Sequence, residues 1–187
     1  AKMVWPDNAY ETLVFYEEDG PEIEPRLATE VPTVENGLIT NDGQTFEFPL
    51  REGVTFHTGG EMTAQDVAFT IDRVTTMNLA GDASDIDQAI EEVEVVDDYT
   101  IRITTDQPRP AFLTSTIPSK SLGIMSQEAV ESNGGVSEGE RNQWVAQNTA
   151  GTGPYYLAQW NSGSNIRWDL HEDYWAPDTV GPVPAVF

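Results

Sequence analysis

The two histidines of the chain, His57 and His171, are the first candidates for chemistry. His57 lies in the stretch FPLREGVTFHTGGEMTAQDV (residues 48–67), which also holds an arginine, several acids and two adjacent glycines. A histidine pair could bind a metal ion, but neither residue stands in an H-x-x-x-H or H-E-x-x-H spacing. A site would need distant ligands assembled by the fold. We therefore interpret His57 as a hydrogen-bonding residue where a strand meets a turn, and predict neither a metal site nor a catalytic residue.

Two glycine-containing stretches have the form of known motifs. GVSEG (residues 135–139) matches the G-x-S-x-G nucleophile elbow, which requires an apolar strand before the serine and a helix after it. The flanking residues VESNG and ERNQ provide neither. GTGPY (residues 151–155) resembles a phosphate loop only through its glycines, because no lysine follows and Pro154 lacks a backbone N–H. We interpret the first as a chance match and the second as a turn that leads into a strand.

Acidic and aromatic residues leave further alternatives open. A group of acids could bind calcium, but the spacing lacks the EF-hand pattern, so a solvated loop is the default interpretation. These acids are Asp82, Asp85, Asp87, Glu91 and Glu92. A carboxylate pair for glycoside hydrolysis stays open in a chain with 32 acids, although no pair stands out. Five tryptophans could stack on a ligand, but packing in the core or an interface is more common. They are Trp5, Trp144, Trp160, Trp168 and Trp175.

The charge of the chain is strongly negative and evenly spread. Its 187 residues carry 32 acids against 9 bases, a formal net charge of −23, and only Lys2 and Lys120 are lysines. Such self-repulsion disfavours a compact fold in dilute salt, whereas in molar salt the Debye length falls to roughly 3 Å and apolar burial strengthens. The composition therefore predicts a halophilic protein. It also argues against nucleic acid as a partner, because no basic stripe could neutralise phosphates.

The composition also limits redox chemistry and membrane insertion. The chain has no cysteine, which excludes disulfides, thiolate catalysis and cysteine metal sites. No apolar run reaches the roughly 18 residues of a membrane-spanning helix, and residues 1–13 do not have a signal-peptide pattern. The abrupt start leads us to expect a segment of a longer protein.

Hydrophobic periodicity predicts strands and a helix in the first half of the chain. Residues 45–50 alternate, with phenylalanines and a leucine on one face, and Pro49 favours an edge position or a bulge. Residues 54–57 begin a second short strand. Thr63, with Asp66 three positions later, has the form of a helix cap, and the apolar spacing that follows continues to Met77.

The second half predicts further strands and one short helix. Residues 90–108 have the alternation of a hairpin that turns at Asp97-Asp98. Residues 126–133 have the form of a short capped helix stopped by two glycines, and residues 155–175 that of another strand pair. Hairpins with intervening helices indicate an α+β, or mixed α/β, fold.

Four stretches, in this order, resemble the extracellular solute-binding proteins of family 5, the dipeptide, oligopeptide and nickel receptors of ABC importers. They are YETLVFYEEDGPEIEPRLATEV (10–31), TFEFPLREGVTFHTGGEMTAQDV (45–67), VEVVDDYTIRITTDQPRPAFL (93–113) and GTGPYYLAQWNSGSNIRWDLHEDYW (151–175). Thr58 and Gly60 depart modestly from the family pattern. Its most specific positions are matched by Arg51, Gly53, His57, Gly59, Thr63, Asp66, Gly151, Gly153, Pro154 and Tyr155.

The resemblance implies part of the N-terminal lobe of a two-lobed, periplasmic-binding-protein-like clamp that closes on its ligand. Residues 1–150 would be the subdomain inserted in the first lobe and residues 151–187 the return into that lobe's sheet, with the second lobe absent. The implied ligand is a peptide or a related solute such as a nickel chelate, and the implied partner is an ABC permease in the membrane. We expect an extracellular or cell-surface protein, anchored to the membrane, without cofactor or catalysis.

For ligand contacts we select the irregular segment 114–121, and in it Thr114, Ser115 and Lys120. The lysine could pair with a ligand carboxylate, whereas an ordinary exposed lysine is the competing interpretation. Two other functions stay open: a carbohydrate-active hydrolase using a carboxylate pair, and a solute-sensing module of a regulator.

Overall fold

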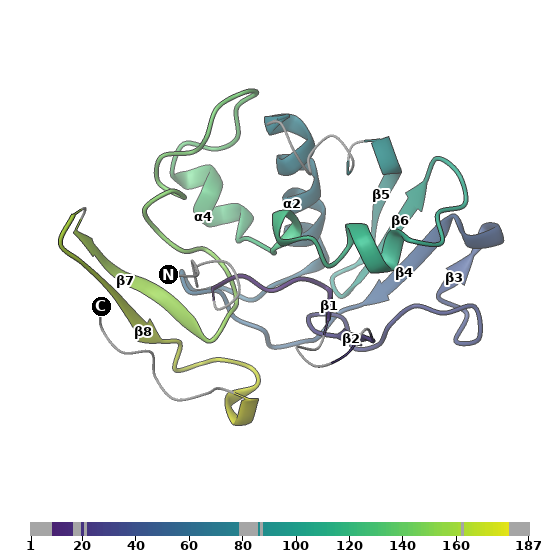
Figure 1. Ribbon diagram of the computed structural model, residues 1–187, viewed down its shortest axis with the longest axis horizontal. Helices are drawn as coiled ribbons and strands as arrows, with labels where there is room; N and C mark the ends of the chain where they lie inside the picture. The colour runs from purple at the N-terminus through teal and green to yellow at the C-terminus, as the bar shows by residue number, and fades with distance from the viewer. Residues whose placement is uncertain are drawn as a thin grey trace.

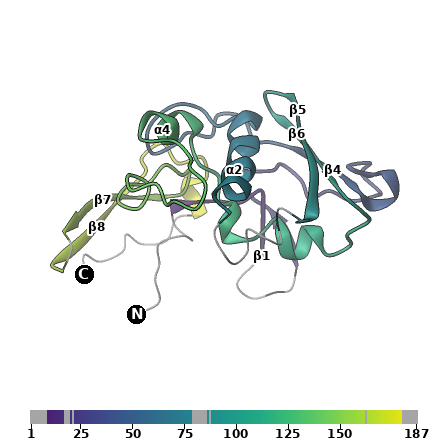
Figure 2. The same cartoon turned by 90° about the horizontal axis from the view of Figure 1, so that it is seen from above.

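Helices α2 and α4 and three antiparallel sheets organise the protein in the computed structural model (Figure 1). The structure describes residues 9–16, 20, 22–78, 86, 88–161 and 163–179. Figures 1 and 2 both show α2 between a four-stranded sheet and the β7–β8 hairpin, which lie at opposite ends of the molecule. This mixture of helix and sheet agrees with the predicted α+β class.

The four-stranded sheet has the order β3-β4-β6-β5. These strands span Ile39–Thr40, Thr45–Pro49, Thr100–Thr105 and Ile90–Asp97. Phe46 pairs with Ile103 and Phe48 with Ile101, and all four side chains are buried on one face, as the alternation predicts. Pro49 pairs with β6 on one side only, because β3 ends its pairing at Phe46. Proline has no backbone N–H to donate, and at Pro49 no second strand needs that donor.

Helix α2 (Ala64–Met77) covers the buried face of this sheet. Thr63 and Asp66 form the predicted capping box, in which the Thr63 backbone N–H donates to the Asp66 carboxylate at 3.0 Å. The apolar face is buried, and the helix ends at Asn78, whose φ of 44° is left-handed. The predicted start, end and buried face of α2 are therefore confirmed.

The remaining elements are short. They are β1 (Val14–Tyr16), β2 (Ile23–Pro25), η1 (Asn41–Gly43), the π-helical turn η2 (Phe112–Thr116), η3 (Lys120–Leu122), α4 (Gln127–Ser132), β7 (Tyr155–Asn161), β8 (Asn165–Leu170) and η4 (Pro177–Thr179). The predicted hairpins β5–β6 and β7–β8 and the short helix α4 are confirmed. No helix in the described part of the chain is long and apolar enough to cross a membrane.

One strand prediction was wrong, and the short strands β1, β2 and β3 were not predicted. Residues 54–57 do not form a strand; only Thr55 makes an isolated bridge, to Glu61, because the turn at Gly59-Gly60 folds this segment back on itself. Conversely, β2 lies in a stretch for which no strand was predicted, and which contains Gly20, Pro21 and Pro25. It forms because its backbone pairs with β1, with Phe15 opposite Glu24.

Candidate functional site

A buried carboxylate, Glu11, joins the two ends of the described chain. Its side chain is 2% exposed. Its Oε1 accepts hydrogen bonds from Arg26 Nε and the Tyr174 hydroxyl, both at 2.8 Å. Its Oε2 accepts from the Thr152 hydroxyl at 2.9 Å and from Trp175 Nε1 at 3.0 Å. Four donors satisfy the four accepting positions of one carboxylate, so the charge is fully compensated although water is excluded.

Two arginines and an indole ring extend this cluster. The Arg51 guanidinium lies 4.5 Å from the centroid of the Trp175 ring, and Arg51 Nε donates to the carbonyl of Arg26 at 2.6 Å. The Arg26 guanidinium in turn lies 4.9 Å from the centroid of the Phe15 ring. Cation–π stacking and hydrogen bonds thus hold both arginines in place.

The GTGPY stretch packs directly against the start of the described chain. A Cβ atom added at Gly151 would lie 2.0 Å from the carbonyl oxygen of Ala9, so only glycine allows this approach. The backbone N–H of Gly153 donates to the same oxygen at 3.1 Å, and the backbone N–H of His57 donates to the carbonyl of Gly151 at 2.9 Å. The stretch is therefore a turn into β7, as predicted, and it also carries a close backbone contact.

Both histidines bind one carbonyl oxygen of this turn. His57 Nε2 lies 2.8 Å and His171 Nδ1 lies 3.2 Å from the oxygen of Gly153, and the ring centroids are 5.0 Å apart. A carbonyl oxygen only accepts, so each of these nitrogens carries a proton. No group of three or more histidine, aspartate or glutamate side chains in the described residues is arranged to hold a metal ion. The pair thus fixes the turn at Gly153.

Burial makes His57 resist protonation. It lowers the pKa of His57 to about 4, with repulsion from His171 adding to the effect and the hydrogen bond to Gly153 opposing it. His57 Nδ1 is buried and has no hydrogen-bond partner among the described residues. A proton added there would be a buried charge without an acceptor.

We expect this histidine to reduce the stability of the chain in acid. Its pKa is lower in the folded state than the ordinary value of about 6.5, so the unfolded chain binds the extra proton first. Stability from this group is complete above pH 6.5 and falls toward pH 4, by up to about 3 kcal/mol. We expect the free energy of unfolding, measured in urea at constant salt, to fall more steeply from pH 6.5 to pH 4 for the wild type than for His57→Gln. Parallel curves would contradict the assignment.

The predicted ligand-contact segment lines a hollow of about 430 Å³. Its described lining is Tyr16, Ile86, Thr114, Ser115, Thr116, Pro118, Ser119 and Lys120. The Tyr16 hydroxyl donates to the carbonyl of Thr114 at 2.6 Å, which ties the end of β1 to the π-helical turn η2. The structure therefore brings Thr114, Ser115 and Lys120 together at one surface; that they contact ligand stays a prediction.

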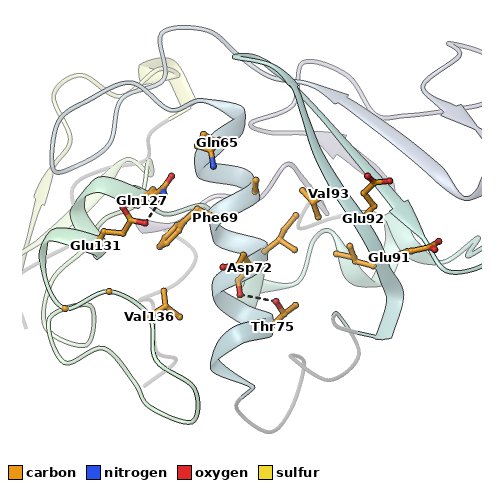
Figure 3. A pocket seen from close by; sticks show the side chains of 15 residues that line it. Gln65, Phe69, Asp72, Thr75, Glu91, Glu92, Val93, Gln127, Glu131 and Val136 are labelled. Carbon is orange, nitrogen blue, oxygen red and sulfur yellow. Dashed lines mark hydrogen bonds between the residues drawn. The ribbon is translucent and has the colours of Figure 1, made fainter.

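Two other hollows differ from this one in charge. A groove of about 970 Å³ lies between α2, β5 and the loop after α4, with an apolar floor that includes Phe69 (Figure 3). Four carboxylates line it: Asp72, Glu91, Glu92 and Glu131. A smaller hollow of about 340 Å³ near the start of α2 also has four acids in its lining. Among the described residues that line the hollow of Lys120, there is no carboxylate.

Among the residues that the structure describes, the other candidate motifs do not assemble into sites. Ser137 is exposed in a turn with no strand before it, so GVSEG is not a nucleophile elbow. Of the proposed calcium ligands, Glu91 and Glu92 lie on β5, whereas Asp82, Asp85 and Asp87 fall outside the described residues. Trp175 packs in the Glu11 cluster, and Trp160 is 42% exposed on β7. Trp5 also lies outside the described part of the chain.

Sequence reasoning did not identify Glu11, which is one acid among 32. Its hydrogen-bond partners Thr152, Tyr174 and Trp175 lie 141 to 164 positions away. The available signal was indirect: Glu11, Arg26, Arg51, Thr152 and Trp175 all belong to the stretches that carry the family resemblance. These five residues meet in the Glu11 cluster, so the stretches that carry the resemblance build a structural joint.

Solved structures with this fold are two-lobed periplasmic binding proteins. DppA of Helicobacter pylori, solved in complex with the peptide STSA, matches with a TM-score of 0.73 and 30% identity, over 96% of this chain and 36% of that one. NikZ of Campylobacter jejuni, solved in complex with Ni(L-His), matches with a TM-score of 0.72 and 25% identity, over 90% and 31% of the two chains. The protein therefore has the fold of one part of such a binding protein.

The sequence comparisons define the family. The model of the bacterial extracellular solute-binding proteins, family 5 Middle, matches residues 22–184, and the chain belongs to this family. Di/tripeptide-binding protein 3 of Pseudomonas aeruginosa is 29% identical, and heme-binding protein A of Haemophilus influenzae is 30% identical. These matches cover 91% and 89% of this chain but 33% and 32% of the relatives. The chain thus spans about a third of the length of the curated relatives it matches.

Proposed function

We propose that the chain is part of the substrate-binding component of an ABC importer, which captures a small solute outside the cell and delivers it to a membrane permease. The family match over residues 22–184 carries this proposal. Members of the family are solute-binding proteins, and no enzymatic activity is proposed for this chain. The comparisons give the glycoside-hydrolase alternative no support.

Peptides are the ligand class that we propose. Relatives include di/tripeptide-binding proteins, and the DppA structure contains a bound peptide. The nickel–histidine complex in NikZ makes a metal chelate the second candidate. In this account residues 1–150 belong to the subdomain inserted in the first lobe, and residues 151–187 return into the sheet of that lobe. The complete protein is anchored at the cell surface.

A thermal-shift panel on the full-length protein tests this function. A ligand that binds only the native state raises the unfolding temperature. We expect di-, tri- or tetrapeptides to raise it, and Ni²⁺ with histidine to do so only if the ligand is a chelate. A protein that no solute in the panel stabilises, and that instead hydrolyses glycosides, would overturn the proposal.

We also propose that the acidic surface is an adaptation to high salt. The net charge of −23 supports this, as do carboxylates such as Glu91 and Glu92, which share one region of the surface without intervening bases. We expect dilution from molar salt to reduce the helical circular dichroism signal, because repulsion is no longer screened. Unchanged spectra in dilute buffer would contradict the adaptation.

A further inference from the structure

We propose that Arg73 and the hydroxyl of Tyr10 together bind a small monovalent anion at the contact between helix α2 and the start of the described chain. The inference goes beyond the proposed function, because it assigns a binding site that does not depend on capture of a transported solute. Chloride and the carboxylate group of a small solute share the chemistry of such a ligand, which is one negative charge and several lone pairs that accept hydrogen bonds.

The guanidinium of Arg73 has no counter-charge in the described part of the chain. It is half-buried, its Nε is fully buried without a hydrogen-bond partner, and no described carboxylate forms an ion pair with it. Four other arginines each pair with a carboxylate at 2.8 to 3.1 Å: Arg26, Arg102, Arg109 and Arg167. Because a chain with 32 acids offers many partners, and because an uncompensated charge away from water is costly, the unpaired state of Arg73 points to a ligand.

The hydroxyl of Tyr10 is a second donor without an acceptor. Its oxygen accepts a hydrogen bond from the backbone N–H of Ala150 at 3.2 Å, whereas its own proton is donated to no described residue. Burial raises the pKa of the Tyr10 phenol, with the Ala150 N–H and the charge of Arg73 opposing this effect, so the hydroxyl keeps its proton at neutral pH. Both groups therefore have hydrogens to donate and lie near each other, and one acceptor can satisfy both.

The backbone segment 123–125 holds the two groups in place. Arg73 lies one turn after Thr70 on α2, and the hydroxyl oxygen of Thr70 accepts a hydrogen bond from the backbone N–H of Met125 at 3.1 Å. Two positions earlier, a Cβ added at Gly123 would lie 2.8 Å from the Cβ of Tyr10. Helix α2 and Tyr10 are thus packed against the same segment, and a site held in this way loses little conformational freedom when it binds.

The charge balance selects a small anion with one charge. Arg73 supplies a single positive charge, so a monovalent anion neutralises the site. Sulfate or phosphate would leave excess negative charge in a chain whose net charge is −23. Water is the competing occupant, because it accepts the same hydrogens, but it does not compensate the charge of the guanidinium.

Chloride NMR of the full-length protein tests the inference in sodium sulfate, a salt that favours the folded state. Exchange of chloride with a protein site broadens the NMR signal of the ion. We expect the wild type to broaden this signal and Arg73→Met, which keeps an apolar side chain but removes the charge, to abolish the broadening. Tyr10→Phe should weaken the apparent affinity for chloride about fivefold, the effect of one lost hydrogen bond.

Arg141→Gln is the matched control. It removes one positive charge from an exposed position and should leave the broadening unchanged. Arg73→Lys keeps the charge but loses the planar set of donors, so it should retain part of the broadening. Circular dichroism checks that each variant is folded, and if Arg73→Met does not fold, Arg73→Lys and Tyr10→Phe provide the comparison.

Competition distinguishes the two sources of the anion. If acetate and tri-alanine displace chloride at similar concentrations, the site accepts free anions. If tri-alanine acts at a concentration about tenfold lower than acetate, the occupant is the carboxylate of a bound solute. Either outcome supports a site for monovalent anions.

Two results would overturn the inference. Equal broadening by the wild type and by Arg73→Met would place the chloride elsewhere on the protein. No broadening by the wild type, even in molar chloride, would mean that water alone satisfies the two donors. Neither result bears on the proposed function, because the thermal-shift panel tests solute binding separately.

Discussion

Replacing Glu11 by glutamine is expected to lower the free energy of unfolding of the chain by about 3–5 kcal/mol, the usual cost of breaking a buried ion pair from one side. Glutamine has nearly the same shape, but its amide group would present hydrogens to two groups that themselves donate. Arg26 would also lose its counter-charge, which lies at 2.8 Å. Urea unfolding followed by tryptophan fluorescence measures the loss.

Glu35→Gln is the matched control for this experiment. It removes the same charge at an exposed position, where substitutions usually change stability by less than about 0.5 kcal/mol. If the free energy of unfolding of Glu11→Gln lies within about 1 kcal/mol of that of the control, the four hydrogen bonds do not act as a joint.

Replacing Gly151 by alanine should destabilise the chain by about 3 kcal/mol or more, because overpacking a rigid contact shifts the backbone. The new Cβ would lie 2.0 Å from the carbonyl oxygen of Ala9 and 2.7 Å from the Tyr10 ring. Relief of this clash requires movement of the turn that also accepts the hydrogen bond from the backbone of His57. The same urea unfolding assay gives the change in stability.

Gly20→Ala provides the comparison, since an added Cβ there meets its nearest atom at 3.8 Å and the backbone is not left-handed. That substitution should be neutral or slightly stabilising, through the reduced entropy of the unfolded chain. Equal stability of the two alanine variants would refute the close approach of residues 9 and 151.

The elements with strong local signals could be predicted from sequence. Helix α2 has a capping box at its start and apolar spacing along one face, and the β5–β6 hairpin has strict alternation in Ile101 and Ile103. The short strands were less predictable. A two-residue strand such as β3, or the three residues of β2, forms through its pairing partner and leaves no periodic signal of its own.

The sites were less predictable than the fold because they depend on distant contacts. The Glu11 cluster and the hollow of Lys120 each join residues far apart in sequence; Tyr16 and Thr114 are 98 positions apart. Selecting segment 114–121 required only its irregular sequence and its lysine, whereas its position beside Tyr16 became visible only in the folded chain. Conversely, the histidine-containing stretch had the densest chemistry, and His57 serves to hold a backbone turn.

The central claim is that the family's signature residues form a joint and that ligand contacts lie elsewhere. It is tested most directly by titrating full-length wild type and Glu11→Gln with tri-alanine, well below the unfolding temperature of the variant. The account predicts dissociation constants within threefold of each other, although the variant unfolds earlier in urea. A tenfold or larger loss of affinity, with native circular dichroism, would place Glu11 in the ligand site and contradict the account.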